Sequence, residues 1–286
     1  MKHVILIPVY NDWKSLNKLL SEIDKCLKTI KNFNTEILIL NDKSTEEYYI
    51  NNHNFFSIKK IKILTLKKNL GSQKSIAIGL SYLNKSKDKF FVTVMDGDGE
   101  DNPNEIEKML NEAEKYENFV ITSNRKKRKE SLLVVFLYKI HLLITFVFTL
   151  KWISFGNFTT FNSKNIIKLL SNNSSWYAHS SSVLKNCEIK KVYAKREKRY
   201  FDKSKLNLIA LIEHSLRVNT VFFPKIFINS LLYSAIILLT VKTLYLNYIL
   251  IFLILIFNIL LFFIKKKHHI KDLSDSDNLI DNIKLH

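Results

Sequence analysis

The sequence predicts an α/β protein in which a mostly parallel sheet, flanked by helices, precedes a membrane-associated C-terminal part. Two observations predict this fold class. In the first 123 residues, short β-branched or aromatic runs alternate with segments of helical apolar spacing, an order typical of a parallel sheet with helices on both faces. After residue 220, two long apolar segments joined by the short link "KTL" have about the length that a bilayer requires.

Five strands are expected in residues 1–123, each a short apolar run bounded by polar residues. They cover residues 3–9, 36–40, 61–66, 90–95 and 119–123. Apolar residues recur at helical spacing after the first, third and fourth runs: Leu16, Leu19, Leu20, Ile23 and Leu27, then Ile76, Leu80 and Leu83, then Ile106, Met109, Leu110 and Ala113. Ligands of such sheets bind at the carboxyl ends of the strands.

Polar residues follow three of the expected strands, at Asn11–Asp12, Asn41–Asp42 and Asp96–Asp98. Because the carboxyl ends of parallel strands share one edge, all three segments are expected on a single rim. Turn formation or helix capping explains Asn11 or Asp12 alone as well as ligand binding does. It does not explain the segment "VMDGDGED", because four neighbouring carboxylates repel one another and a turn needs only one or two.

That acidic segment predicts a divalent cation. Its carboxylates, Asp96, Asp98, Glu100 and Asp101, lie in a chain whose formal net charge is +18. Closely spaced carboxylates are hard ligands, suited to Mg²⁺ or Mn²⁺ that completes its shell with a phosphate. The sequence has neither a P-loop nor a G-x-G-x-x-G dinucleotide motif. A nucleotide bound mainly through a metal on its diphosphate is therefore expected.

Two transmembrane helices are expected in the C-terminal part, at about 224–241 and 245–264 within a membrane segment that covers 221–264. The basic run "KKKHH" follows them directly and marks its side of the membrane as cytoplasmic. We therefore expect a multi-pass protein of the inner or plasma membrane, with the sheet-containing domain and the tail at 265–286 in the cytoplasm and the acidic, polar end of that tail mobile.

Residues 124–220 form the expected acceptor-side half, with an apolar run at 131–150 and a basic loop at 195–205. The apolar run carries Lys139 and His141 at its centre. Because a charge there is costly in hydrocarbon, a helix in the membrane interface or against the core is favoured over a span.

The position of the positive charge favours a membrane over nucleic acid as a partner. Basic clusters lie at Arg125–Lys129, Lys190–Lys205 and Lys265–His269, and the last directly follows an apolar segment, as in proteins attracted to anionic lipids. No nucleic-acid recognition motif accompanies these clusters. The cysteines, Cys26 and Cys187, match no metal spacing, which favours reduced thiols in a chain that faces the cytoplasm.

Four segments in this order resemble a known family. "IPVYND", "LILNDKS", "LKKNLGSQKSIAIGL" and "VMDGDGEDNPNEI" are similar to glycosyltransferase family 2, the inverting GT-A fold, and to its membrane-anchored branch of dolichyl-phosphate-mannose-synthase-like and polyprenyl-phosphate glycosyltransferases. The resemblance implies a transferase of cell-surface glycan synthesis that uses a nucleotide-diphosphate sugar and Mg²⁺ or Mn²⁺. Its acceptor would be lipid-linked, either polyprenyl phosphate or a growing glycan, and a homo-oligomer stays open.

The resemblance assigns donor-binding residues by position. Pro8, Tyr10 and Asn11 would line the nucleotide pocket, and Asp42 would hydrogen-bond the base. Lys74 would approach the donor, although a solvated helix lysine explains this residue nearly as well.

The same resemblance divides the acidic segment into roles. Asp96 and Asp98 match the family's D-x-D pair and would bind the donor and the metal, with Asp98 as the principal metal ligand and Glu100 as a further one. Asp101 or Glu100 would be the catalytic base if the acceptor is a sugar hydroxyl, which must lose its proton.

Two later segments resemble the family less completely. "FGNFTTFNSK", residues 155–164, resembles G-D-F-R-x-x-S-R, but Asn157 and Thr159 replace its acid and its arginine. "REKRYFDKSKLNL" keeps two arginines of the family pattern, Arg196 for the donor and Arg199 as a catalytic residue. These arginines would close over the diphosphate, and a basic patch that faces lipid headgroups is the alternative.

The acceptor site is the least defined part of the resemblance. Arg125, Arg128 and Lys205 are candidates for binding the lipid phosphate, because the arginine and serine that this branch has before its interfacial helix are missing here. The departures at Asn41 and in segment 155–164 leave open an alternative function, a catalytically inactive GT-A-like membrane scaffold or lipid-binding subunit.

Overall fold

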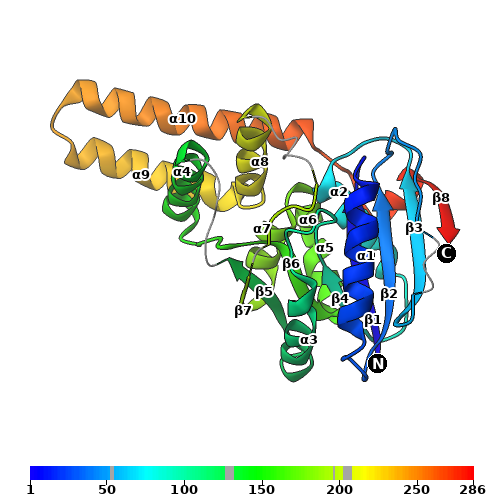
Figure 1. Ribbon diagram of the computed structural model, residues 1–286. Helices are drawn as coiled ribbons and strands as arrows, with labels where there is room; N and C mark the ends of the chain where they lie inside the picture. Colours follow the sequence, from blue (N-terminus) through cyan, green and yellow to red (C-terminus); the bar gives the residue numbers. More distant parts are fainter. Residues whose placement is uncertain (52–54, 126–131, 196, 202–207) are drawn as a thin grey trace. The chain divides into compact units, whose positions relative to one another are not determined.

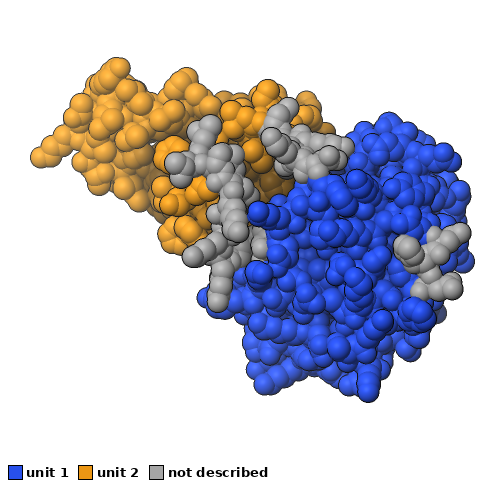
Figure 2. All heavy atoms as spheres, in the orientation of Figure 1, with its two compact units in different colours: residues 1–127, 154–204, 272–286 blue, residues 128–153, 205–271 orange. Residues whose placement is uncertain are grey.

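The computed structural model describes residues 1–51, 55–125, 132–195, 197–201 and 208–286. The chain divides into two compact units, coloured separately in Figure 2. Unit 1 comprises residues 1–127, 154–204 and 272–286, and unit 2 comprises residues 128–153 and 205–271. The acceptor-side half expected at 124–220 is therefore divided: its middle belongs to the unit that contains the sheet, and its two ends belong to the unit that contains the apolar helices.

Unit 1 is built on a mixed sheet in which the described residues form eight strands, in the order β7-β5-β6-β4-β1-β2-β3-β8 (Figure 1). The strands are β1 Lys2–Val9, β2 Asn34–Asn41, β3 Ile58–Leu66, β4 Phe90–Val94, β5 Phe119–Arg125, β6 Phe155–Asn162, β7 Glu188–Ala194 and β8 Ile280–Leu285. Strands β3, β2, β1 and β4 pair in parallel, whereas β6 runs antiparallel to β4 and β5. All five expected strands are present, so the α/β prediction is confirmed.

Helices cover both faces of the sheet, because successive strand residues point to opposite sides. Helices α1 (Trp13–Leu27) and α3 (Ile106–Lys115) pack with Ile5 and Ile7 of β1 in one buried core. Helix α2 (Ser72–Leu83) covers the other face so closely that a Cβ atom on Gly79 would lie 2.6 Å from Cδ1 of Leu6. Shorter helices complete this unit: α5 Ile166–Leu170, α6 Ser174–Tyr177 and α7 His179–Asn186.

The C-terminal tail is part of the sheet, so the expectation of a mobile tail is wrong. β8 pairs antiparallel with β3, and the N–H of His286 donates to the carbonyl of Ile61 at 2.9 Å. Before this strand, the hydroxyl of Ser81 in α2 donates to the carbonyl of Leu273. Figure 1 shows β8 in red along the outer edge of β3. The tail therefore satisfies backbone groups of an edge strand that would otherwise be open.

Unit 2 consists of the helices α4 Leu132–Thr149, α8 Leu208–Thr220, α9 Phe223–Thr240 and α10 Leu244–Lys267. Helices α9 and α10 are long and apolar enough to cross a membrane, with mean hydropathies of 1.6 and 2.7 over 18-residue windows. Their bounds agree closely with the two helices expected from the sequence. The amide of Asn258 donates to the hydroxyl of Ser230 at 2.8 Å and joins these two helices. Glu213 of α8 accepts hydrogen bonds from Lys267 of α10.

Candidate active site

Strands β1, β2 and β4 end at the same edge of the sheet and form the rim that the sequence predicts. Val9 at the end of β1 pairs with Asn41 at the end of β2, and Leu6 pairs with Val94 at the end of β4. Hydrogen bonds continue past the strand ends, from the N–H of Asp42 to the carbonyl of Val9. The loops that begin at these three ends are therefore neighbours.

The loop after β1 is fastened to the loop after β2 by Asn11. This residue has a left-handed backbone (φ 48°), and its Oδ1 accepts the N–H groups of Thr45 at 2.8 Å and Glu46 at 3.2 Å. Of the other two residues expected to line the nucleotide pocket, Tyr10 is exposed on the rim and Pro8 is buried within β1. The geometry gives Asn11 a positioning role, and contact with a nucleotide stays a prediction for all three.

Asp42 holds the loop that leads into α2. Its two carboxylate oxygens accept the N–H groups of Leu70 and Gly71, each at 2.7 Å. Burial raises the pKa of Asp42, and these two hydrogen bonds act in the opposite direction. Lys74, in the first turn of α2, lies with Nζ 4.9 Å from the ring centre of Trp176. The predicted contacts of Asp42 with the base and of Lys74 with the donor remain predictions.

The acidic segment after β4 folds back on itself through its own carboxylates. The N–H of Asp96 donates to Oδ2 of Asp101 at 3.0 Å, and the N–H of Glu100 donates to Oδ1 of Asp98 at 3.0 Å. Gly99 between them has φ 85°, a left-handed conformation that favours glycine. Asp101 is buried, whereas Glu100 is partly exposed.

Residues 197–201 lie directly on this acidic loop. The N–H groups of Glu197 and Tyr200 donate to the carbonyls of Glu100 and Asp98, each at 3.0 Å. The ring of Tyr200 covers Gly99 so tightly that a Cβ atom there would lie 2.4 Å from the ring. Two segments about a hundred residues apart are thus held together by backbone hydrogen bonds and ring packing.

Arg199 connects this segment to two carboxylates of the rim. Its guanidinium forms ion pairs with Asp12 and with Oδ2 of Asp98, the latter at 3.3 Å. Burial, together with the nearby charges of Asp96 and Glu100, raises the pKa of Asp98 to about 6, while Arg199 acts in the opposite direction. The rim therefore contains a desolvated group of carboxylates that a cation stabilises.

The D-x-D carboxylates fit a hard divalent cation in chemistry and spacing. Asp96 and Asp98 offer oxygen ligands from one short loop, and a cation would offset both causes of the raised pKa of Asp98, which are its burial and the nearby charges of Asp96 and Glu100. In the part of the chain that the structure describes, no group of three or more His, Cys, Asp or Glu side chains is arranged to hold a metal. Glu100 as a further metal ligand thus stays a prediction.

The remaining site residues predicted from the sequence lie within or directly beside segments that the structure does not describe. Arg196, Arg128 and Lys205 lie outside the described residues, and Arg125 is placed only as the last residue of β5. The ion pair of Asp12 with Arg199 was missed by sequence reasoning, because Asp12 is equally typical of a turn. Its only sequence signal was its place directly after the first strand.

Comparison with known proteins identifies the family. The family model described as Glycosyl transferase family 2 matches residues 4–174, which include the whole rim. The chain belongs to glycosyl transferase family 2. The resemblance seen in the sequence is therefore confirmed. The alternative of an inactive scaffold is not favoured.

Individual relatives of this family 2 chain are distant. The dodecaprenyl-phosphate galacturonate synthase of Rhizobium johnstonii is 25% identical over 130 residues, which are 45% of this chain and 37% of that protein. The match thus spans little more than a third of the relative's length.

One solved structure supports the GT-A fold. The glucosyl-3-phosphoglycerate synthase from Mycobacterium tuberculosis, in complex with Mn²⁺, UDP and phosphoglyceric acid, is similar with a TM-score of 0.52 and 13% identity, over 79% of this chain and 78% of that one. S. aureus TarS 1-349 matches with a TM-score of 0.46 and 14% identity, over 79% of this chain and 65% of that one. At these identities the likeness concerns the fold alone.

Proposed function

We propose that this glycosyltransferase is an inverting, metal-dependent enzyme that transfers a sugar from a nucleotide-diphosphate sugar to a lipid-linked acceptor. The observation that carries the proposal is the guanidinium of Arg199 between the carboxylates of Asp12 and Asp98. At the carboxyl ends of the strands, carboxylates that attract a cation therefore lie beside an arginine that can bind phosphate. These are the two kinds of group that a metal-bound diphosphate requires.

Each part of this site has a distinct task in the proposed reaction. A divalent cation bound there would neutralise charge on the departing diphosphate. Asp96 and Asp98 would hold it. Arg199 would exchange its carboxylate partners for diphosphate oxygens, since a guanidinium binds both anions through the same fork of N–H groups. Residues 197–201 would then exclude water from the leaving group.

On the donor side, Tyr10, Asp42 and Lys74 are the proposed nucleotide contacts. Tyr10 is exposed on the rim, as a residue that stacks on a base must be. Asp42 binds two backbone N–H groups and the side chain of Ser75, and its two oxygens have four lone pairs, so a further donor such as a base N–H can still be accepted. Asn11 and the buried Pro8 would position this wall of the pocket.

On the acceptor side, the two possible acceptors differ in their need for a general base. Polyprenyl phosphate is already anionic, whereas a sugar hydroxyl needs a proton acceptor within hydrogen-bond reach. Glu100 suits this role better than Asp101, because Asp101 is buried and binds the N–H of Asp96. Arg125, Arg128 and Lys205 remain the proposed contacts of the lipid phosphate.

A membrane location supports the lipid-linked acceptor. Helices α9 and α10 are apolar along their length, and the basic residues Lys265, Lys266 and Lys267 end α10, as expected on the cytoplasmic side. The Rhizobium relative is named for a dodecaprenyl phosphate, and the Mycobacterium structure contains Mn²⁺ and UDP. We accordingly propose a multi-pass protein of the inner or plasma membrane whose sheet-containing unit is cytoplasmic.

The test is binding and turnover by the full-length chain in detergent or in membranes. Thermal unfolding is measured with a panel of nucleoside diphosphates, each with and without Mn²⁺, and a stabilising nucleotide that requires the metal is the expected result. Transfer from the matching nucleotide sugar is then assayed with polyprenyl phosphate for the wild type and Asp98→Asn. The proposal is overturned if Asp98→Asn keeps full activity, or if chelation of divalent ions leaves turnover unchanged.

A further inference from the structure

A chain of side-chain amides connects the D-x-D motif to the start of a buried helix. Nδ2 of Asn157 in β6 donates to Oδ1 of Asp96 at 2.9 Å. Nε2 of Gln73 in α2 donates to Oδ1 of Asn157 at 3.1 Å. The backbone N–H of His179, the first residue of α7, donates to Oε1 of Gln73 at 2.7 Å. Three elements that are distant in sequence are thus linked, one after another, to one carboxylate.

The side-chain amides of Gln73 and Asn157, called the relay below, can each be oriented in only one way, because the groups at both ends of the chain of hydrogen bonds are fixed as donor and acceptor. A backbone N–H can only donate, so Gln73 must turn its oxygen to His179 and its nitrogen to Asn157. The oxygen of Asn157 is then occupied, and its nitrogen must face Asp96. An ionised carboxylate can only accept, so the order ends consistently there. Gln73 and His179 are buried, so reversing one amide would place two donors or two acceptors face to face where water does not compensate.

We propose that Asn157 and Gln73 are positioning residues, which orient the carboxylate of Asp96 for the metal and the donor. By holding Oδ1, Asn157 restricts rotation of the carboxylate and so fixes the direction of Oδ2, the oxygen left for the ligand. Gln73 acts through Asn157, because it keeps the amide of Asn157 from turning over. The inference rests on the proposed function, in which Asp96 binds the metal-bound donor.

This role explains why the departures of segment 155–164 from the family pattern do not imply that the donor-binding site has lost its function. An acid at position 157, as in the family segment, could not donate to Asp96 unless protonated, whereas the amide of Asn157 donates without adding charge beside three carboxylates. Thr159 faces the same side of β6 and contacts the same helix start, since its hydroxyl lies 2.8 Å from Nε2 of His179. The two departures therefore form one neutral network.

Gln73→Glu is the informative variant because it reverses the relay and keeps the size of the side chain. Asn157→Ala adds no charge beside the buried Gln73, so it checks that the effect comes from the lost hydrogen bond. A glutamate oxygen still accepts the N–H of His179, so the start of α7 keeps its partner. The second oxygen cannot donate to Asn157, so the amide of Asn157 turns its nitrogen to position 73 and withdraws it from Asp96. Thr159→Val is the matched control, because it removes the contacts of the hydroxyl with His179 and with the backbone carbonyl of Asn157 and leaves the side-chain hydrogen bonds of the relay in place.

The experiment measures the Mn²⁺ concentration for half-maximal activity, the affinity for the nucleoside diphosphate with Mn²⁺, and the thermal midpoint without ligand. We expect Gln73→Glu and Asn157→Ala to raise the Mn²⁺ requirement and weaken metal-dependent nucleotide binding about 10-fold, the lower end of the range for outer-shell partners of metal ligands. Thr159→Val is expected to leave both at the wild-type values. Nucleotide binding without metal should change little in any variant.

The possible outcomes separate this inference from the proposed function. If the wild type shows no metal-dependent nucleotide binding, the proposed function is wrong, and the inference, which rests on it, is wrong as well. If the wild type binds the nucleotide in a metal-dependent way, and Gln73→Glu and Asn157→Ala have the same Mn²⁺ requirement and nucleotide affinity as the wild type, only the inference is wrong. A purely structural role would lower the thermal midpoint and leave the Mn²⁺ requirement unchanged, which also overturns it. Should Gln73→Glu not fold, Asn157→Ala, at a partly exposed position, decides between these outcomes.

Discussion

The two ends of the strands carry opposite arrangements of charge. At the rim, one cation lies between two acids: Arg199 contacts Asp12 and Asp98. At the other end, where β4 begins and β6 ends, one acid lies between two cations: Glu117 contacts Lys89 and Lys164 at 3.1 and 3.2 Å. Both clusters join distant segments of unit 1, so the number of ion pairs does not distinguish them.

Exposure distinguishes the two clusters. The side chains of Asp12, Asp98 and Arg199 are 17%, 18% and 23% exposed. Those of Glu117, Lys164 and Lys89 are 37%, 44% and 67% exposed. Water and salt screen the second group, whereas charges removed from water interact strongly and must be compensated.

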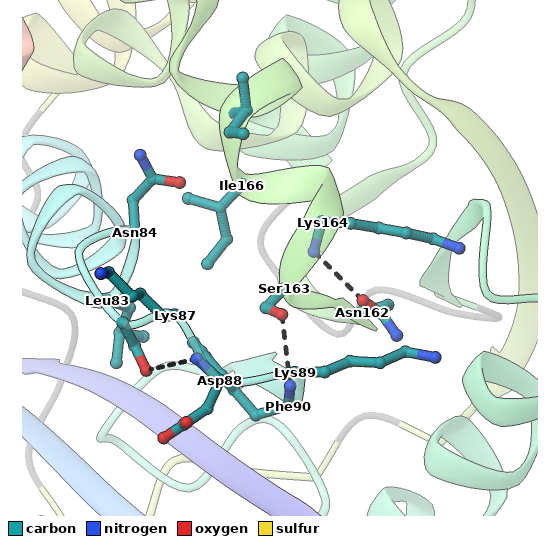
Figure 3. Close-up of a pocket in the computed structure, with 12 residues that line it drawn as sticks. Leu83, Asn84, Lys87, Asp88, Lys89, Phe90, Asn162, Ser163, Lys164 and Ile166 are labelled. Carbon is teal, nitrogen blue, oxygen red and sulfur yellow. Dashed lines mark hydrogen bonds between the residues drawn. The ribbon is translucent and has the colours of Figure 1, made fainter.

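Cavity volume does not distinguish the two ends of the sheet, because a cavity of about 330 Å³, lined by Asn102, Glu197 and Tyr200 among others, lies beside the acidic loop. The exposed end contains a cavity of about 310 Å³, lined by Lys89, Phe90, Ser163, Lys164 and Ile166 among others. Figure 3 shows that its polar groups are largely engaged locally: the N–H of Phe90 donates to the hydroxyl of Ser163, and the N–H of Lys164 donates to Asn162. A functional site is better recognised by converging, desolvated charges than by open volume.

The largest expected effect comes from removing the cation at the rim. Arg199→Ala leaves Asp12 and Asp98 without their shared partner and removes the proposed contact with the diphosphate. We expect turnover to fall by about 100-fold, the loss typical of removing one group that stabilises charge in the transition state. Steady-state transfer assays at saturating nucleotide sugar measure this effect.

Arg199→Lys is the control for that prediction. A single ammonium keeps the charge but cannot form the fork that reaches two carboxylates or two phosphate oxygens. It should recover only part of the activity. If Arg199→Ala retained wild-type turnover, the buried cluster would be structural and the comparison between the two ends would lose its functional meaning.

A smaller effect is expected from a buried titratable group near the exposed end. His3 lies at the start of β1, between the hydroxyls of Thr35 and Thr93, and burial lowers its pKa to about 3. The unfolded chain binds a proton below about pH 6.5, whereas the folded chain does not, so the free energy of unfolding decreases as the pH falls below that value. His179, whose pKa burial lowers to about 4, acts with the same sign.

The measurement is the thermal midpoint of unfolding between pH 7 and pH 5 for the wild type and His3→Gln. For His3 the loss at pH 5 is about 2 kcal/mol, since each pKa unit corresponds to about 1.4 kcal/mol. We expect His3→Gln to have a lower midpoint at pH 7 but a shallower dependence on pH, because the contribution of His3 is lost while those of His179 and His214, whose pKa values desolvation also lowers to about 4, remain. An equal dependence in both proteins would show that His3 does not remain neutral when folded.

The rim could be predicted from the sequence because it depends on local patterns. The β-branched runs mark strand ends, and the spacing of Asp96 and Asp98 marks the acidic loop that is proposed to bind a metal. The order of strand and helix then brings three loops together without any knowledge of individual contacts. Family resemblance added the roles of these residues.

The partners of the rim could not be predicted, because they depend on tertiary packing. Arg199 and Asp12 are 187 positions apart, and Gln73 and Asn157 are 84 apart. No periodicity relates such pairs. β8 was missed for a different reason: Ile283 and Leu285 are exposed, so this strand forms through backbone hydrogen bonds to an edge and leaves no apolar alternation in the sequence.

The smallest effect is expected from the exposed cluster. Glu117→Gln removes the negative charge between Lys89 and Lys164, but each of these exposed ion pairs contributes only about 0–1 kcal/mol. We therefore expect the thermal midpoint to shift by no more than about 4 °C and transfer activity to stay at the wild-type level. The shift should disappear in about 1 M salt, because the Debye length is then about 3 Å. A loss of activity comparable to that of Arg199→Ala would reverse the comparison, because the open cavity at this end would then be part of the working site.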